Sequence, residues 1–211
     1  MARDPVAYDR TAMLKLLRPA VTRVLTPLGR ALARMGISPN VITVLGTLGV
    51  TAGALVCYPR GQLFLGSVVI TFFVLADLLD GVLARMLGNG STFGAFLDST
   101  LDRVGDAAVF SGLIFWFVST GERVLAAVAL FCLVAGAVVS YVKARAEGLG
   151  LSCDVGLAER SERLVVVLVA AGLGGLGVPY ILPAGLWLLA AASAFTAGQR
   201  IMHVYRQTVP T

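Results

Sequence analysis

Apolar residues occupy six long stretches of the chain, and short polar or glycine-rich segments separate them. A helix that crosses a bilayer needs about 20 mostly apolar residues, and each stretch is close to that length. The pattern therefore predicts an all-α integral membrane protein with six transmembrane helices. The predicted spans are residues 41–58, 62–87, 92–119, 122–146, 158–177 and 180–204.

The N-terminal residues follow a different pattern, in which apolar residues recur at spacings of three and four among basic ones. Over residues 10–35 this indicates a basic amphipathic helix in the membrane interface, bent or broken near Pro19 or Pro27. We therefore expect two parts: an N-terminal cytoplasmic or interfacial segment over residues 1–36, and a membrane domain over residues 37–206.

Composition supports lipid as the solvent for most of the chain. Of the 211 residues 57% are hydrophobic and only 14% are charged, whereas about a quarter are charged in a typical soluble domain. The net charge is +5, and the basic residues concentrate near the N-terminus, in residues 140–163 and near the C-terminus. With six spans these segments fall on one side, which the positive-inside tendency places in the cytoplasm. We expect a multi-pass cell-membrane protein whose functional site faces the cytoplasm and which binds no nucleic acid.

Four aspartates lie inside the second and third predicted spans: Asp77, Asp80, Asp98 and Asp102. An ionisable residue near the bilayer centre costs roughly 3 kcal/mol or more and is a functional candidate. Each pair shares one face of its helix, because its members are three or four positions apart. The short loop between the spans lets the two pairs face each other. Carboxylates that close disfavour each other's ionisation unless a cation neutralises them, and oxygen ligands favour Mg²⁺, Mn²⁺ or Ca²⁺ over zinc.

Small residues and an arginine adjoin these aspartates. Gly81 lies one turn after Asp77, and Gly94 lies one turn before Asp98, so both helix faces leave room for a bulky group near the backbone. Arg85 can bind phosphate oxygens through its planar guanidinium. A metal held by carboxylates beside an arginine is typical of phosphoryl transfer.

Two other interpretations compete with an enzyme. The aspartates could form a buried ion-pair network with Arg85 and Arg103, but four acids against two bases would leave it unbalanced. An ion-coupled membrane transporter also carries acidic residues within its spans. It would predict inverted repeats and broken helices at mid-membrane, and the sequence shows neither.

From Asp77 to Asp102 the chain reads Asp-x2-Asp-Gly-x2-Ala-Arg-x8-Gly-x3-Asp-x3-Asp. This resembles the signature of the CDP-alcohol phosphotransferase family, with every defining position present. The resemblance implies transfer of a phosphatidyl or similar group from a CDP-linked donor to an alcohol, with release of CMP. It implies that Asp77, Asp80 and Asp98 are the main metal ligands. Asp102 would be the general base and would also contact the metal.

The same resemblance implies a binding site for the CDP moiety. It involves the glycine and arginine of the signature and an Asn-x2-Thr segment at the start of the first span. The implied donor contacts are Pro39, Asn40, Val41, Ile42, Thr43, Gly81, Arg85 and Ser91. From the residues alone, Ser38-Pro39-Asn40 is equally an ordinary helix start, in which Ser or Asn caps free N–H groups.

A second polar cluster lies at the ends of the fourth, fifth and sixth predicted spans. These three helix ends bring five cations near the four carboxylates, which indicates a pocket for a phosphate group on the acceptor. The alternative is that the cations reflect the positive-inside tendency and contact lipid headgroups. The candidates for the acceptor phosphate are Ser140, Lys143, Arg145, Arg160, Arg163 and Arg200.

Residues 140–148 and 159–163 resemble the phosphatidylinositol-phosphate synthases of actinobacteria. That resemblance implies CDP-diacylglycerol as donor, 1L-myo-inositol 1-phosphate as acceptor, and Mg²⁺ as cofactor with Mn²⁺ as a substitute. Phosphatidylglycerophosphate synthase, which uses glycerol 3-phosphate, is the alternative. A homodimer in the lipid bilayer is also implied, and Gly49-xxx-Gly53 would permit close helix packing within or between chains.

Overall fold

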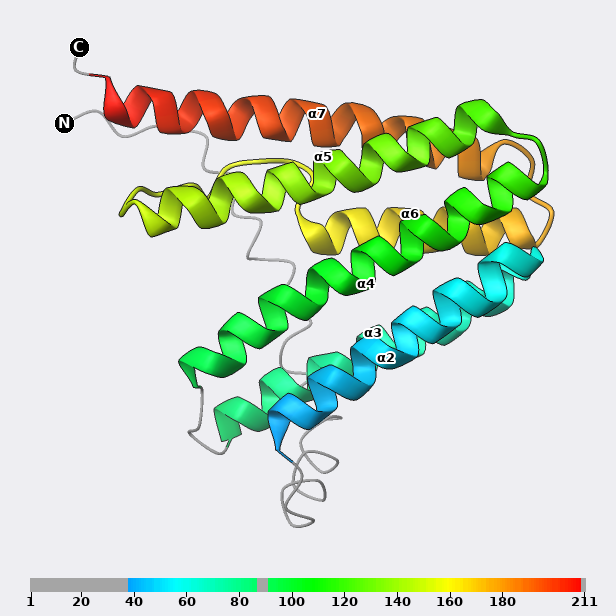
Figure 1. Ribbon diagram of the computed structural model, residues 1–211, viewed down its shortest axis with the longest axis horizontal. Helices are drawn as coiled ribbons and strands as arrows, with labels where there is room; N and C mark the ends of the chain where they lie inside the picture. Colours follow the sequence, from blue (N-terminus) through cyan, green and yellow to red (C-terminus); the bar gives the residue numbers. More distant parts are fainter. Residues whose placement is uncertain (1–37, 87–90, 210–211) are drawn as a thin grey trace.

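The computed structural model describes residues 38–86 and 91–209, apart from the side chains of residues 77–86. Within these ranges all regular structure is helical (Figure 1). The expected N-terminal amphipathic helix lies outside the described residues. The elements are α2 (Pro39–Cys57), the short 3₁₀ helix η1 (Tyr58–Arg60), α3 (Leu63–Met86), α4 (Thr92–Ser119), α5 (Arg123–Gly148), α6 (Arg160–Gly175) and α7 (Ile181–Thr208).

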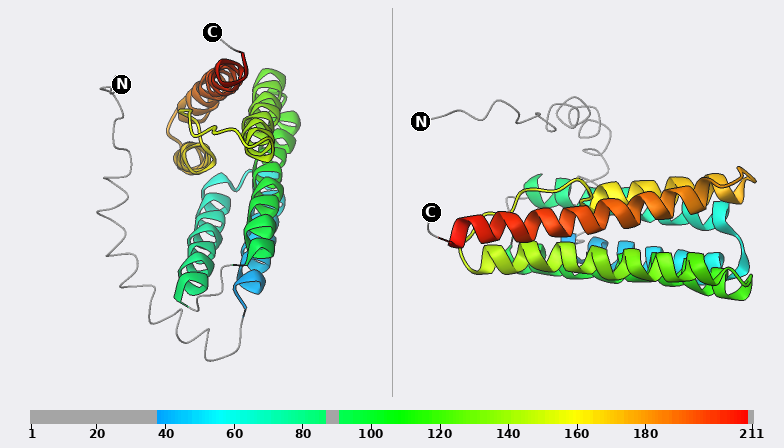
Figure 2. Two further views of the ribbon diagram at one scale, coloured as in Figure 1. Left: turned by 90° about the vertical axis from the view of Figure 1, so that its left-hand side faces the viewer. Right: turned by 90° about the horizontal axis from the view of Figure 1, so that it is seen from above.

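The six α-helices run alternately up and down and pack as a closed ring. Around the ring α2 packs on α3 and α4, α4 on α5, α5 on α7, α7 on α6, and α6 on α3. At one end of the bundle, here called the polar end, α3, α5 and α7 finish and α2, α4 and α6 begin (Figure 1). The short connections around residues 58–62, 120–122 and 176–180 lie at the opposite, far end. Figure 2 shows the same helices from the polar end and from above.

Glycines let neighbouring helices approach closely. A Cβ atom on Gly49 or Gly53 of α2 would collide with Phe73 or Val69 of α3, and one on Gly112 of α4 would collide with the Ala54 carbonyl of α2. The Gly49-xxx-Gly53 motif therefore serves packing inside the chain, between α2 and α3.

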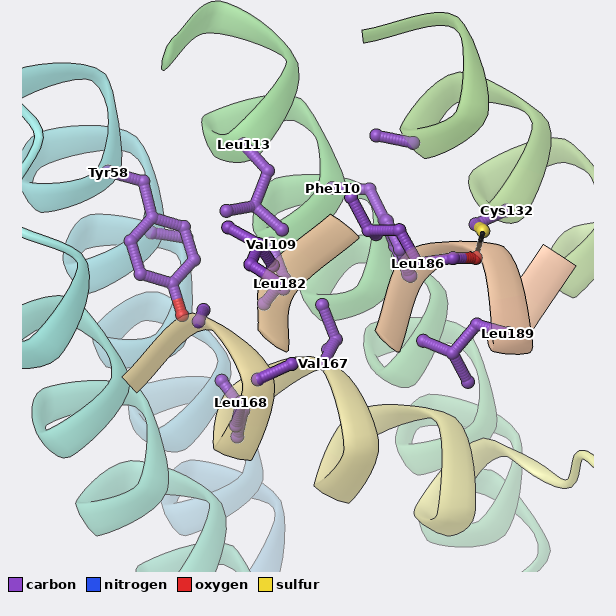
Figure 3. Close-up of a cluster of buried hydrophobic side chains, with 14 of the residues drawn as sticks. Tyr58, Val109, Phe110, Leu113, Cys132, Val167, Leu168, Leu182, Leu186 and Leu189 are labelled. Atoms are coloured by element: carbon purple, nitrogen blue, oxygen red, sulfur yellow. Dashed lines mark hydrogen bonds between the residues drawn. The ribbon is translucent and has the colours of Figure 1, made fainter. Parts of the chain in front are cut away.

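The interior of the ring is apolar at its centre and toward the far end. Val109 and Leu113 of α4, Val167 of α6 and Leu186 of α7 are almost fully buried and converge there (Figure 3). Near the far end Tyr58 is buried and its hydroxyl lies 2.9 Å from the Ser67 hydroxyl. A buried hydroxyl needs such a partner, because its transfer out of water without one is costly. Among the described residues, the buried arginines Arg163 and Arg200 lie toward the polar end instead.

The outer surface identifies a membrane protein. Large apolar side chains such as Phe72, Phe115 and Leu188 are more than half exposed. Contact of so much apolar surface with water would be unfavourable. Among the described residues three helices are long and apolar enough to cross a membrane, over Pro39–Arg60, Arg123–Gly148 and Ile181–Thr208. The other helices differ for identifiable reasons: α3 and α4 carry the charged signature at the polar end, and α6 has only 16 residues.

Candidate active site

The first turns of α2 and α4 come together at the polar end. Ser38 precedes α2 with extended backbone, and Pro39 occupies the first turn, where a missing N–H breaks no helical hydrogen bond. The Ser38 side chain makes no capping hydrogen bond. Ser91 does cap α4, because its Oγ atom accepts a 2.9 Å hydrogen bond from the Gly94 backbone N–H.

The side chain of Asn40 reaches from α2 to the start of α4. A Cβ atom on Gly94 would lie 3.2 Å from Asn40 Oδ1 and 3.0 Å from Ser91 Oγ. Thr43, one turn further into α2, is buried, and its hydroxyl donates to the Pro39 carbonyl at 3.2 Å. Two of the residues expected to bind the CDP moiety, Asn40 and Ser91, thus converge around a glycine that keeps the space between them open.

Asp98 and Asp102 lie on α4 at the polar end. Asp98 is exposed, and the Asp102 side chain retains 18% exposure. The expected ligands Asp77 and Asp80 lie on α3, which ends beside the start of α4 (Figure 1). Their side chains lie outside the described residues.

The side chain of Arg85 and the surroundings of Gly81, also on α3, lie outside the described residues as well. Among the described residues no group of three or more His, Cys, Asp or Glu is close enough to hold a metal ion. The two aspartates of α4 account for only half of the expected set. Their oxygen-only chemistry and their position on one helix face fit a hard divalent cation.

An arginine pair from α6 meets the carboxylates of α4. Arg160 Nη1 lies 2.7 Å from Asp102 Oδ1, and Arg160 Nε lies 3.3 Å from Asp106 Oδ1. Arg163 Nη2 donates to Asp106 Oδ2 at 3.0 Å. Arg103 adds a 3.5 Å contact to Asp102 Oδ2. The sequence interpretation missed Asp106, although the four-residue spacing of Asp98 and Asp102 continues to it.

A cavity of about 540 Å³ opens beside this cluster, between α4, α5, α6 and α7. Its wall includes five of the six residues expected to bind the acceptor phosphate: Ser140, Lys143, Arg160, Arg163 and Arg200. Arg145 is not part of the wall, because it lies two positions after Lys143 and so points to another side of α5. Five cations line the cavity (Arg103, Lys143, Arg160, Arg163 and Arg200) against two carboxylates (Glu147 and Glu159).

The deeper cations of the cavity are held by backbone carbonyls. Arg200 is 3% exposed; its Nε donates to the Val155 carbonyl at 2.7 Å and its Nη1 to the Val139 carbonyl at 2.8 Å. Arg163 is 2% exposed, and its Nη1 donates to the Ala158 carbonyl at 3.1 Å. These two arginines therefore form a rigid part of the wall.

The cation nearer the cavity mouth is held more loosely. Lys143 donates a 2.6 Å hydrogen bond to Asp154 in the loop after α5. That ammonium group holds the pKa of Asp154 below its usual value. Because both side chains are at least partly exposed, Lys143 can exchange this partner for a bound anion.

An all-helical membrane protein with an acidic helix face beside a basic cavity has the features of a membrane enzyme for phosphorylated substrates. Residues 36–198 match the model of the CDP-alcohol phosphatidyltransferase family. The chain belongs to the CDP-alcohol phosphatidyltransferase family.

Curated relatives and solved structures agree with this assignment. The chain is 53% identical over 206 residues to the phosphatidylinositol phosphate synthase of Streptomyces avermitilis, covering 93% of this chain and 84% of that protein. It is 48% identical over 194 residues to the enzyme of the same name from Mycobacterium tuberculosis, covering 90% and 89%.

Two crystal structures of the Mycobacterium tuberculosis enzyme have the same fold. The structure with CDP-DAG bound superposes with a TM-score of 0.83 at 48% identity, covering 87% of this chain and 94% of that chain. The complex with manganese and citrate has a TM-score of 0.82 at 48% identity, covering 86% and 88%.

Proposed function

We propose that this chain is a phosphatidylinositol phosphate synthase. It transfers the phosphatidyl group of CDP-diacylglycerol to 1L-myo-inositol 1-phosphate and releases CMP. The observation that carries the proposal is the basic cavity beside Asp102: five cations against two carboxylates line it, and two of them, Arg103 and Arg160, also contact Asp102. Such a cavity neutralises the phosphate that the acceptor brings with it. The relatives named above, at 48–53% identity, support the same acceptor.

The reaction replaces a phosphoanhydride bond of the donor by a phosphoester bond to the acceptor. A hydroxyl oxygen of the acceptor bonds to the β-phosphorus of the donor, and the bond from that phosphorus to the bridging oxygen breaks, so that CMP leaves with the electron pair. Asp102 takes the hydroxyl proton, as a general base within reach of the acceptor cavity. Its neighbour Arg160 keeps the carboxylate oriented and also lines the cavity.

A divalent cation, Mg²⁺ or Mn²⁺, completes the proposed donor site. Asp77, Asp80, Asp98 and Asp102 would hold it, and when bound it neutralises the negative charge of the donor's pyrophosphate. The manganese complex of the Mycobacterium tuberculosis enzyme supports a metal of this kind.

Protein groups would bind the remainder of the donor. Gly81 and Arg85 of α3 are assigned to the CDP moiety, together with the segment Pro39–Thr43 and Ser91. The convergence of Asn40 and Ser91 at Gly94 supports a nucleotide site between α2 and α4.

We further infer that all six helices cross the cell membrane, with both termini and the active site on the cytoplasmic side. The described helices alternate in direction, and the basic residues at the ends of α5, α6 and α7 gather at the polar end, as the positive-inside tendency requires of a cytoplasmic face. The N-terminal segment would lie in the interface on that side, and the enzyme would act as a homodimer. Accessibility of single introduced cysteines at residues 60 and 122, compared with residue 150, tests the orientation.

An acceptor screen tests the activity. Purified protein in detergent or lipid is supplied with CDP-diacylglycerol and Mg²⁺ or Mn²⁺, and CMP release is followed with inositol 1-phosphate, glycerol 3-phosphate, free inositol or serine. We expect inositol 1-phosphate to give the highest kcat/KM. A preference for glycerol 3-phosphate would instead identify a phosphatidylglycerophosphate synthase. Absence of CMP release with every acceptor would contradict an enzymatic role and favour an ion-coupled transporter.

A further inference from the structure

We propose that Asp106 is a positioning residue of the acceptor site: it holds Arg160 and Arg163 in the orientation in which they bind the acceptor's phosphate. The proposal rests on the function proposed above, because it assumes that the basic cavity receives a phosphorylated acceptor. Asp106 lies one turn beyond Asp102 on α4, after the end of the family signature.

One carboxylate divides its two oxygens between two arginines. Asp106 Oδ1 faces Arg160 Nε at 3.3 Å, and Asp106 Oδ2 accepts a hydrogen bond from Arg163 Nη2 at 3.0 Å. The Asp106 side chain is only 14% exposed. The charge-assisted hydrogen bond to Arg163 is directional as well as strong, so the carboxylate sets the direction of that guanidinium group. Arg160 Nε makes an ion-pair contact with Asp106 without a hydrogen bond, and Arg160 is held in addition by Asp102.

Two further groups contact the guanidinium of Arg163. Its Nη1 donates to the Ala158 carbonyl at 3.1 Å. Its guanidinium also lies against Gly136 of α5, where an added Cβ atom would come within 3.0 Å of Nε and 3.2 Å of Cζ. The orientation of the Arg163 side chain is therefore restricted from three sides: by Asp106, by the end of the loop before α6 and by Gly136 of α5.

The two arginines need such a partner because they are close together and carry like charge. Arg160 and Arg163 are three positions apart on the first turn of α6 and share a helix face. Without a carboxylate between them, repulsion would drive two long, flexible side chains apart. Fixing them in advance reduces the entropy that acceptor binding would otherwise lose.

The contacts of Asp106 indicate that it supports acceptor binding without contacting the acceptor itself. Both of its arginines line the cavity, whereas Asp106 itself is not among the lining side chains. A carboxylate in direct contact with the acceptor would repel its phosphate. Asp106 therefore acts through the arginines, and its loss should affect acceptor binding before donor binding.

Steady-state kinetics of Asp106→Asn test the proposal. We expect the KM for inositol 1-phosphate to rise about tenfold or more, since a hydrogen bond to a charged group contributes at least that factor. The KM for CDP-diacylglycerol should change by less than about twofold, because the donor binds elsewhere. Asp106→Glu, which keeps the charge, should recover part of the acceptor affinity. Glu122→Gln, which removes an exposed carboxylate at the far end, is the matched control and should behave as the wild type.

A double-mutant cycle separates positioning from general damage. If Asp106 acts through Arg163, then Asp106→Asn should add little to the acceptor KM of Arg163→Ala, because coupled residues are not additive. Binding is also measured without turnover: inositol 1-phosphate should raise the melting temperature of the wild type, and the rise should shrink in Asp106→Asn. Equal increases in the KM of both substrates, or full additivity in the cycle, would overturn the proposal.

A second variant covers the case in which Asp106→Asn does not fold. Gly136→Ala removes no charge but shifts the Arg163 guanidinium by a few tenths of an ångström, and it should raise the acceptor KM selectively. An unchanged acceptor KM in Gly136→Ala would count against the proposal. Wild-type protein that releases no CMP with inositol 1-phosphate would refute the proposed function instead. Wild-type turnover with an unaffected Asp106→Asn would refute the positioning role alone.

Discussion

Arg160 Nη1 lies 2.7 Å from Asp102 Oδ1. The contact joins α6 to α4, two helices that are not adjacent in the ring, across the interior of the polar end. It places the proposed base next to a side chain that lines the acceptor cavity. In the proposed reaction this ion pair would couple proton removal from the acceptor to recognition of its phosphate.

Replacing Asp102 by Asn should abolish the chemical step. An amide cannot take the acceptor's proton, and loss of a general base typically lowers the rate by about 10²–10⁴-fold. CMP release measures the effect, and binding of CDP-diacylglycerol should be largely retained. Thr100→Ala is a control on the same helix, since the Thr100 hydroxyl donates to the Phe96 carbonyl. Substantial turnover in Asp102→Asn would remove this residue from the base role.

Replacing Arg163 by Ala should weaken acceptor binding. The guanidinium lines the cavity and is 2% exposed, so the variant loses a pre-positioned cation. We expect the KM for inositol 1-phosphate to rise more than the KM for CDP-diacylglycerol. Arg145→Ala is a matched control, because that exposed side chain lies outside the cavity wall. Equal rises for both substrates would indicate a purely structural role for Arg163.

Replacing Arg200 by Ala should affect stability as well as the acceptor KM. The side chain ties the Val155 carbonyl of the loop before α6 to the Val139 carbonyl of α5. Leaving a buried carbonyl without its donor costs about 1–3 kcal/mol, so the melting temperature should fall. Arg200→Lys should not restore it, because one ammonium cannot reproduce the spread of the guanidinium fork. A melting temperature equal to that of the wild type would contradict this structural role.

Replacing Gly156 by Ala should destabilise the loop before α6. Gly156 has a φ of 136°, and an added Cβ atom would lie 2.5 Å from the Thr196 methyl group. The Thr196 hydroxyl accepts hydrogen bonds from the backbone N–H groups of Leu157 and Ala158, so the clash disturbs the approach to α6. We expect a loss of about 1–3 kcal/mol, typical of a residue forced into such a conformation, measured by thermal unfolding. Gly198→Ala, where an added Cβ meets nothing within 4 Å, should be neutral or stabilising.

Chelation should remove activity reversibly. Carboxylates that share a site need a divalent cation to remain ionised together, so EDTA should stop CMP release and Mg²⁺ or Mn²⁺ should restore it. Asp98→Asn should raise the metal concentration required for half-maximal activity. Thr100→Ala, at an exposed position of the same helix, serves again as the control. Full activity in excess EDTA would contradict the assignment of the aspartates as metal ligands.

The helices were largely predictable because they depend on local pattern. The predicted third span, residues 92–119, coincides with α4 (Thr92–Ser119), and the predicted span 158–177 differs from α6 (Arg160–Gly175) by two residues at each end. The spacing of Asp98 and Asp102 likewise indicated one shared face of α4. Arg145 was grouped with Lys143 from proximity in sequence, and helix geometry turns the two side chains apart.

Local spacing and apolar length were sufficient to predict a helical membrane protein with paired carboxylates, because helix formation and the sharing of a helix face depend on residues within a few positions of one another. The partners of those carboxylates could not be predicted from local spacing. Asp106 and Arg163 are 57 positions apart in the chain, and no periodicity relates them. Only the closure of the ring brings the first turn of α6 across to α4, because the apolar core fills the far end and leaves the charged side chains to meet at the polar end.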